Sequence, residues 1–116
     1  MTFDHGKLLP LSEATYYALV ALDEPMHGYA VMQKVETISE GSVTIGPGTL
    51  YGIFTTLEKQ QLIVKLREEE RRKIYALTDG GRALVREQVR RLAIMVKNGA
   101  HFGATPDNPF NQGVAA

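Results

Sequence analysis

The chain has 116 residues, of which 44% are apolar and 22% are charged, and its formal net charge is zero. This composition predicts one compact globular domain and argues against both a disordered chain and a second full domain. No apolar run approaches the roughly 20 residues of a membrane-spanning helix, the start lacks the pattern of a secretory signal, and the absence of cysteine excludes disulfides. We therefore expect a cytoplasmic protein.

Two amphipathic helices are predicted in the first third of the chain. Ser12 can cap a helix over residues 13–24, which ends before Pro25. A second helix is predicted over residues 27–40 and stops at Gly41, a residue that favours the left-handed cap. The apolar residues of both segments recur at helical spacing, which indicates that each helix buries one face.

A third helix is predicted to begin at Pro47, after one short strand at residues 42–45. Leu50 and Leu57 lie seven residues apart and, together with an apolar residue between them, mark the face that packs in the core. The opposite face is small and polar and carries Thr49, Gly52, Thr55, Thr56 and Lys59.

A β-hairpin and a long helix follow. Residues 62–67 and 73–78 are rich in β-branched and aromatic side chains and predict two strands joined by a charged tip. Thr78 then caps a helix over residues 79–99. Its predicted apolar stripe consists of Val85, Val89, Leu92 and Val96.

This order of elements is that of a winged helix-turn-helix, in which the second and third helices read DNA and the hairpin is the wing. We therefore predict a mainly α fold with a small β-hairpin. The expected domains are a winged helix-turn-helix over residues 8–78, a C-terminal dimerisation helix over 79–99 and a flexible tail over 100–116.

Charge is distributed unevenly along the chain. Residues 1–58 carry two basic and seven acidic side chains, whereas residues 59–97 carry eleven basic and five acidic ones. A local basic patch attracts nucleic acid regardless of the average charge. The zero net charge therefore does not exclude a nucleic-acid partner.

Four stretches of the sequence resemble, in order and spacing, the signature blocks of the PadR family of bacterial transcriptional regulators. They are "LSEATYYALVAL", "HGYAVMQKVE", "GPGTLYGIFTTLEKQQLI" and "RRKIYALTDGGRALV". The single C-terminal helix resembles the short-tailed branch of that family. The resemblance implies a homodimer held by the last helix, operator DNA contacted by the third helix and the wing, and repression relieved by a small molecule.

The outward face of the third helix and the returning strand of the wing are the candidate DNA-binding surface. A helix that enters the major groove needs a sparse surface near its N-terminus and donors that reach phosphates and base edges, which the hydroxyls of Thr49, Tyr51 and Thr55 can supply. The candidate residues are Gly48, Thr49, Tyr51, Gly52, Thr55, Lys59, Arg71, Arg72 and Lys73. The acidic residues of the tip are expected to point to solvent. Alternatively, Tyr51 packs under the wing, and the charges of the wing pair only with one another.

The apolar stripe of the last helix is too long for one small domain to cover, which predicts a twofold dimer. The candidate dimer contacts are Val89, Leu92, Met95 and Val96 on that helix and Leu8, Leu11, Thr15 and Leu19 of the partner. Alternatively, the helix folds back on its own domain. The tyrosines at positions 16, 17, 29 and 75 are expected in the core, with Tyr16 and Met95 as candidate effector-binding residues. The family's multidrug-responsive members often place aromatic residues on the last helix, whereas this one is aliphatic apart from Met95.

No catalytic or metal site is expected. The three histidines, at positions 5, 27 and 101, share no metal-ligand spacing, and the glycines of "GPGTLYG" do not form a phosphate-binding loop. We therefore expect no cofactor and no enzyme activity. The hypothesis is a dimeric repressor of a pseudo-palindromic operator that responds to a small molecule. The alternative is a winged helix that binds other proteins and not DNA.

Overall fold

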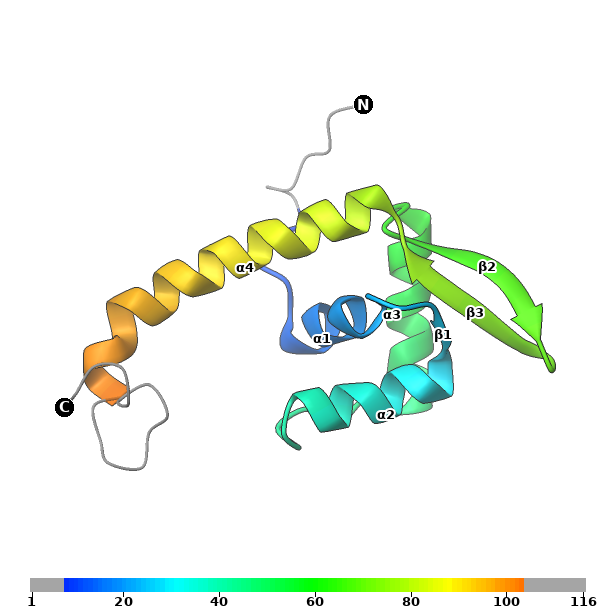
Figure 1. The fold of residues 1–116 in the computed structure, drawn as a ribbon, viewed down its shortest axis with the longest axis horizontal. Coiled ribbons are helices and arrows are strands. Elements are labelled where there is room, and N and C mark those ends of the chain that lie inside the picture. The colour runs from blue at the N-terminus through cyan, green and yellow to red at the C-terminus, as the bar shows by residue number, and fades with distance from the viewer. Residues whose placement is uncertain (1–7, 104–116) are drawn as a thin grey trace.

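The computed structural model describes residues 8–103 and has the predicted winged helix-turn-helix followed by one long helix (Figure 1). The elements are α1 (Glu13–Ala21), β1 (Met26–His27), α2 (Gly28–Ile38), α3 (Pro47–Lys59), β2 (Ile63–Glu69), β3 (Arg72–Leu77), α4 (Asp79–Gly99) and the short 3-10 helix η2 (Ala100–Gly103). The expected flexible tail is wrong for its first four residues, which form η2, and from residue 104 onward it lies outside the described residues.

Three helices begin where the sequence predicts, because their capping residues are local signals. The Ser12 hydroxyl accepts a hydrogen bond from the N–H of Thr15 at 3.1 Å and starts α1. Pro47 occupies the first turn of α3, where its missing N–H leaves no hydrogen bond unmade. The Thr78 hydroxyl accepts from the N–H of Gly81 at 3.0 Å and starts α4.

The second helix is capped by a histidine, which the sequence does not signal. The Nδ1 atom of His27 accepts from the N–H of Ala30 at 3.2 Å. At the other end the chain turns through Glu40 and Gly41, whose φ angles of 54° and 80° are left-handed. The Gly41 N–H donates to the carbonyl of Glu36 at 2.9 Å. The predicted helix is two residues too long at this end, because α2 ends at Ile38 and the left-handed turn begins at Glu40 and includes Gly41.

The predicted hairpin is confirmed, but its tip is shorter than expected. Glu70 and Arg71 alone form the turn, and their positive φ angles of 51° and 67° are those of a tight two-residue hairpin turn. Glu68 and Glu69 therefore belong to β2 and pair with β3. An irregularity between Lys65 and Arg67 leaves one extra residue in β2.

The third strand of the sheet is not the one that the sequence predicts. The strand order is β1-β3-β2, and β1 has only two residues, so it carries no periodic signal. The predicted strand at residues 42–45 is wrong, because this segment forms no ladder. Val43 and Ile45 instead bury their side chains in the core from an irregular segment, which produces the same alternation of apolar and polar residues.

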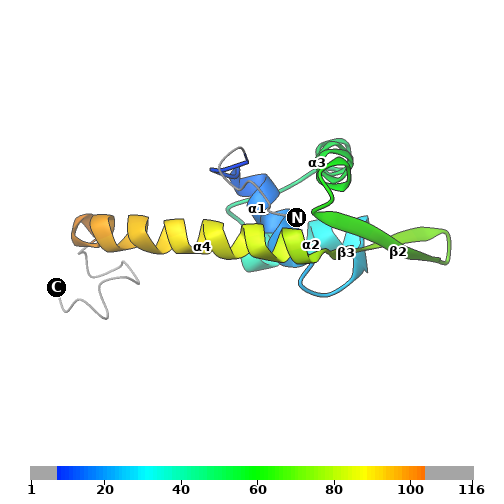
Figure 2. The same cartoon turned by 90° about the horizontal axis from the view of Figure 1, so that it is seen from above.

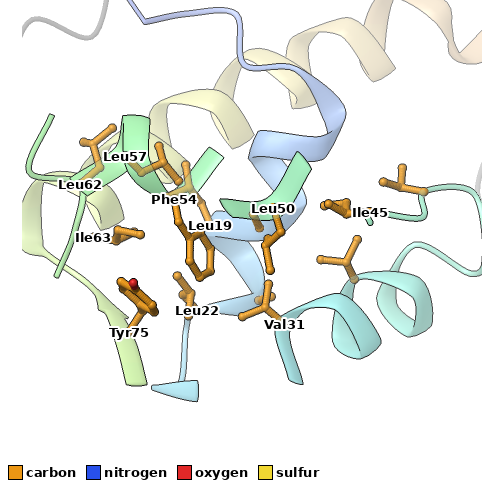
Figure 3. Packing of buried hydrophobic residues seen from close by; sticks show 14 of the residues in the cluster. Leu19, Leu22, Val31, Ile45, Leu50, Phe54, Leu57, Leu62, Ile63 and Tyr75 are labelled. Carbon is orange, nitrogen blue, oxygen red and sulfur yellow. The ribbon is translucent and has the colours of Figure 1, made fainter. Parts of the chain in front are cut away.

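Helices α1, α2 and α3 and the base of the wing surround one core (Figure 3). Leu19, Leu22, Leu50 and Phe54 are at most 1% exposed. The Phe54 ring packs against Tyr75 with centroids 4.7 Å apart. Among the tyrosines expected in the core, that at position 75 is buried and those at 16 and 17 are half-buried. The expectation is wrong for position 29, whose side chain is 57% exposed.

The first half of α4 packs on the body of the molecule, and its second half extends beyond it (Figures 1 and 2). The buried residues of α4 are Gly81, Leu84 and Gln88, and the Gln88 side-chain oxygen accepts from the N–H of Leu11 at 2.8 Å. The buried face of α4 therefore lies one residue earlier in the sequence than the predicted apolar stripe, at 84 and 88 instead of 85 and 89. The valines at 89 and 96 are 46% and 44% exposed. Because one of the buried positions is a glutamine, the spacing of apolar residues alone does not identify the buried face of α4.

One predicted dimer contact is wrong. Leu19 is fully buried in the core of its own chain and cannot contact a second subunit. Leu8 and Leu11 are partly buried against the same core, and Thr15 is half-buried. In the part of the chain that the structure describes, no helix has both the length and the hydropathy to cross a membrane.

Candidate nucleic-acid interface

Helix α3 presents the predicted outward face to solvent. Gly48, Thr49, Gly52, Thr55 and Lys59 are all exposed. A Cβ atom added at Gly48 or at Gly52 would meet no other atom within 4 Å. Packing within this chain therefore does not require either glycine.

A groove separates α3 from the wing, and we call it the wing groove. Tyr51, Thr55 and Glu58 line it from α3, and Arg71, Arg72, Lys73 and Tyr75 line it from the turn and β3; His27, Gly28 and Tyr29 at the start of α2 and the core residue Phe54 complete it. Tyr51 is 60% exposed, so it borders the groove rather than packing under the wing. The groove brings together residues from α3 and from the wing that the sequence assigns to one surface.

The outward face of α3 is nevertheless divided between two grooves. Thr49, Gly52 and Thr56 line a second groove together with Pro10 and Thr15, in the segment before α1 and in α1 itself. The outward face of α3 thus forms a ridge with one groove on each side. In Figure 2 this helix lies to one side of the line formed by α4 and the wing.

One of the three candidate hydroxyl donors on α3 is already used. The Thr55 hydroxyl donates to the carbonyl oxygen of Tyr51 at 2.9 Å. Its oxygen can therefore accept a hydrogen bond from a ligand, whereas its proton is not available. This bond corrects the expectation that Thr55 supplies a donor.

On β2, positive and negative side chains pair with one another. Lys65 lies 2.9 Å from Glu68, and Arg67 lies 3.1 Å from Glu69. The hydrogen bond to Lys65 lowers the pKa of Glu68, and the same bond raises the pKa of Lys65. Glu68 and Glu69 therefore do not simply point to solvent, as expected from the sequence, but neutralise the cations of their own strand.

The cations of the turn and β3 are differently placed. Within residues 8–103, none of Arg71, Arg72 and Lys73 forms a salt bridge. The guanidinium of Arg72 instead lies 2.9 Å from the Nε2 atom of His27. Lys73 is the cross-strand neighbour of Glu68, and its charge helps to lower the pKa of that carboxyl. The cations of the wing that form no salt bridge thus lie on the turn and the strand that border the wing groove.

One acid in the wing groove was not identified from the sequence. Glu58 lies on α3 three residues after Thr55 and seven after Tyr51, so helical spacing alone places it on the same side. Burial raises the pKa of Tyr75, and the negative charge of Glu58 raises it further. Any anion entering the groove meets this carboxylate, which opposes binding.

His27 and Tyr29 were also not identified as site residues. Their rings are stacked, with centroids 6.5 Å apart and planes 17° apart. Both lie in the "HGY" part of a signature block, but their approach to the wing depends on the pairing of β1 with β3. The sequence contains no signal for that two-residue pairing.

The candidate effector-binding residues are not brought to one described cavity. The Tyr16 ring lies edge-on to Tyr17, with centroids 5.5 Å apart. Met95 is 65% exposed on the far half of α4. Among residues 8–103, no group of three or more histidine, aspartate and glutamate side chains is placed to hold a metal ion.

Comparison with known proteins identifies relatives of the chain. The family model described as "Transcriptional regulator PadR-like family" matches residues 18–87. An uncharacterized 37.1 kDa protein in transposon TN4556 of Streptomyces fradiae is 37% identical over 83 residues, which cover 71% of this chain and 24% of that protein. The transcriptional regulator YqjI of Escherichia coli strain K12 is 32% identical over 114 residues, which cover 92% of this chain and 51% of that regulator.

Coverage differs between these relatives and the solved structures. The chain spans about a quarter to a half of the length of the two curated relatives. A solved transcriptional regulator from Clostridium thermocellum matches with a TM-score of 0.65 at 21% identity, over 84% of this chain and 97% of that one. At 21% identity this structural similarity shows a shared fold and nothing more.

Proposed function

Because this chain belongs to the PadR-like family of transcriptional regulators, whose members bind DNA and are not enzymes, we propose that it represses transcription as a homodimer on a pseudo-palindromic operator. In this proposal α3 enters the major groove of the DNA, and the returning strand of the wing holds the neighbouring backbone. A small molecule releases the complex.

The observation that carries this proposal is the wing groove. It joins the exposed Tyr51 on α3 to Arg71, Arg72 and Lys73, which form no salt bridge within the described residues. Cations that form no salt bridge within the protein release the counterions condensed on DNA when they meet its phosphates, and this release supplies most of the sequence-independent affinity for DNA. The N-terminus of α3 adds free N–H groups directed at the same backbone.

The two open glycines of α3 support a close approach by an external surface. Glycine within a helix costs about 0.5–1 kcal/mol relative to alanine. Neither Gly48 nor Gly52 has a neighbour that would exclude a side chain, and neither has a left-handed φ. A DNA groove lying against α3 accounts for both residues, since it leaves little room for side chains there.

The proposed dimer uses the half of α4 that extends beyond the body. Met95 lies seven residues after the buried Gln88, so the face that packs on the body continues as an apolar face with the exposed Val96 and the half-buried Leu92. In the proposal this face covers Leu8, Leu11 and Thr15 of the partner, with Val89 at the margin. Residues 8–78 then act as the DNA-binding domain and 79–99 as the dimerisation helix.

The effector would bind where the two subunits meet. Tyr16 and Met95 are the proposed contacts, because one offers a half-buried aromatic ring and the other a flexible, exposed thioether. Binding there would change the distance between the two α3 helices, which must lie about 34–36 Å apart to occupy successive turns of one DNA face.

A gel-shift experiment tests the proposed function. The protein is mixed with a duplex from the region upstream of its own gene and with a random duplex of equal length, at about 50 and 200 mM salt. We expect the upstream duplex to be bound more tightly than the random duplex, and both complexes to weaken as salt rises. Absence of binding to either duplex at low salt would contradict the proposal and favour the alternative, a winged helix that binds proteins.

A further inference from the structure

At one edge of the wing groove a histidine and an arginine meet. His27 ends β1 and pairs with Ile74 of β3, which brings its ring beside Arg72. The Nε2 atom of His27 and the Nη1 atom of Arg72 are 2.9 Å apart. Within the described residues neither of these two nitrogens has another hydrogen-bond partner.

The capping bond of α2 determines which nitrogen of His27 carries the proton. The backbone N–H of Ala30 can only donate, so Nδ1 must accept, and a neutral ring then carries its single proton on Nε2. A guanidinium group has donors and no acceptor. His27 and Arg72 therefore face each other as two N–H donors.

Two donors at this distance repel one another unless they share an acceptor. Because one donor is a cation, the favoured acceptor is an anionic oxygen, and a phosphate oxygen forms short charge-assisted bonds to guanidinium. Glu69 and Glu70 also border the pair. Glu69 is bound to Arg67 on its own strand, β2, which leaves Glu70 in the turn as the only competing carboxylate that the described residues place on that border.

We propose that His27 and Arg72 together bind one non-bridging phosphate oxygen of the DNA backbone, and we call this pair of residues the clamp. This inference rests on the proposed function and adds a neutral donor from β1 to the cations of the wing. The Tyr29 ring lies nearly parallel to the His27 ring, with centroids 6.5 Å apart. Since the Ala30 bond holds the tautomer, the Nε2–H donor is in place before DNA arrives.

The test uses His27→Asn, Arg72→Met and the double variant. Asparagine caps helices well, so His27→Asn keeps the start of α2 but is too short to replace the Nε2–H donor. Arg86→Met is the matched control, because it removes one positive charge from α4, where Arg86 lines a different groove with Val20 and Ile38. Affinity for the upstream duplex is measured by fluorescence anisotropy over a salt series, and thermal unfolding is measured for each variant.

We expect His27→Asn to weaken binding by about tenfold per subunit, with the slope of log K against log salt unchanged, because the lost donor is neutral. Arg72→Met should weaken binding and reduce the slope by about one per subunit. The loss in the double variant should be smaller than the product of the single losses, since both groups bind the same oxygen. Arg86→Met should change both quantities less than Arg72→Met.

Two results would overturn the clamp while leaving the proposed function intact: wild-type affinity in His27→Asn, or losses that multiply in the double variant. If His27→Asn unfolds at a lower temperature than wild type, His27→Asp decides, because it also caps α2 but places a carboxylate beside Arg72. It should then bind DNA more weakly than His27→Asn, and equal or tighter binding would contradict the clamp. Failure of the wild-type protein to bind DNA at low salt would remove the proposed function and the clamp with it.

Discussion

At Gly81, near the start of α4, the chain has no space for a side chain. An added Cβ atom would overlap the carbonyl oxygen of Leu62, which also accepts from the N–H of Thr78. The loop after α3 and the start of α4 would have to separate to relieve this overlap. We expect Gly81→Ala to lower the free energy of unfolding by about 2 kcal/mol or more, measured by urea denaturation.

Gly80 is the matched control for that substitution. A Cβ atom there would lie 3.7 Å from the nearest atom, the hydroxyl oxygen of Thr78, which is an ordinary contact. Gly80→Ala should therefore change the stability by no more than about 0.5 kcal/mol. Equal effects of the two substitutions would contradict the close packing of α4 on the loop after α3.

The carboxylate of Glu58 provides a second test at the scale of one residue. It lines the wing groove and faces the cations that we propose to bind phosphate. Glu58→Gln removes a repulsive charge, so we expect random-sequence DNA to bind about two- to fivefold more tightly. Glu36→Gln, on a groove of α2 with Thr37 and Glu40, should change affinity less. Weaker binding by Glu58→Gln would instead indicate that Glu58 contacts a base.

At the scale of elements, substitutions at one position of α3 can separate the stability of the helix from its proposed contact with DNA. Gly52 lies in the middle of the helix with open space around it. Gly52→Ala and Gly52→Leu should each raise the free energy of unfolding by about 0.5–1 kcal/mol, because both residues favour helix more than glycine does. If DNA lies against this face, affinity should fall in the order of side-chain size, with Leu weaker than Ala. Unchanged DNA affinity in both variants would mean that α3 does not approach DNA at this position.

Local signals determined how much of the fold was predictable. Capping side chains and a proline fix the starts of α1, α3 and α4, so the sequence locates the starts of these helices, whereas the end of α1 comes three residues before the predicted one. The pairing of β1 with β3 was not predictable, because two residues carry no period. Residues 42–45 alternate like a strand only because Val43 and Ile45 happen to reach the core.

The candidate site was predictable to the extent that it lies within single elements. The outward face of α3 follows from helical spacing, and the basic residues of β3 follow from the hairpin. His27 and Tyr29 join them only through contacts between β1, β3 and the start of α2. The pairing of Lys65 with Glu68 was likewise not predictable, because β2 continues to Glu69, beyond the apolar residues that mark the strand in the sequence.

At the scale of the whole molecule, the extended half of α4 is the part that one chain leaves uncovered. Met95 is 65% exposed within the chain, so Met95→Glu should not unfold the monomer. A charge in an apolar interface is strongly unfavourable, and we therefore expect this variant to be monomeric at micromolar concentration by light scattering. Lys97→Glu, on nearly the opposite side of α4, should remain dimeric.

Two outcomes would contradict the proposed dimer. One is a monomeric wild-type protein, which would show that α4 extends alone into solvent. The other is a dimeric Met95→Glu variant, which would place the interface elsewhere. DNA affinity should fall together with dimerisation, because a single α3 helix would contact only half of the operator.

The salt dependence of DNA binding tests the central claim most directly. With about three phosphate contacts per subunit, and so about six per dimer, the slope of log K against log salt should be near −5 for the wild-type protein. In the triple variant that combines Arg71→Met, Arg72→Met and Lys73→Met, most of that slope should disappear together with the DNA affinity. A variant that keeps the wild-type slope and affinity would show that DNA, if it binds, does not bind along the returning strand of the wing.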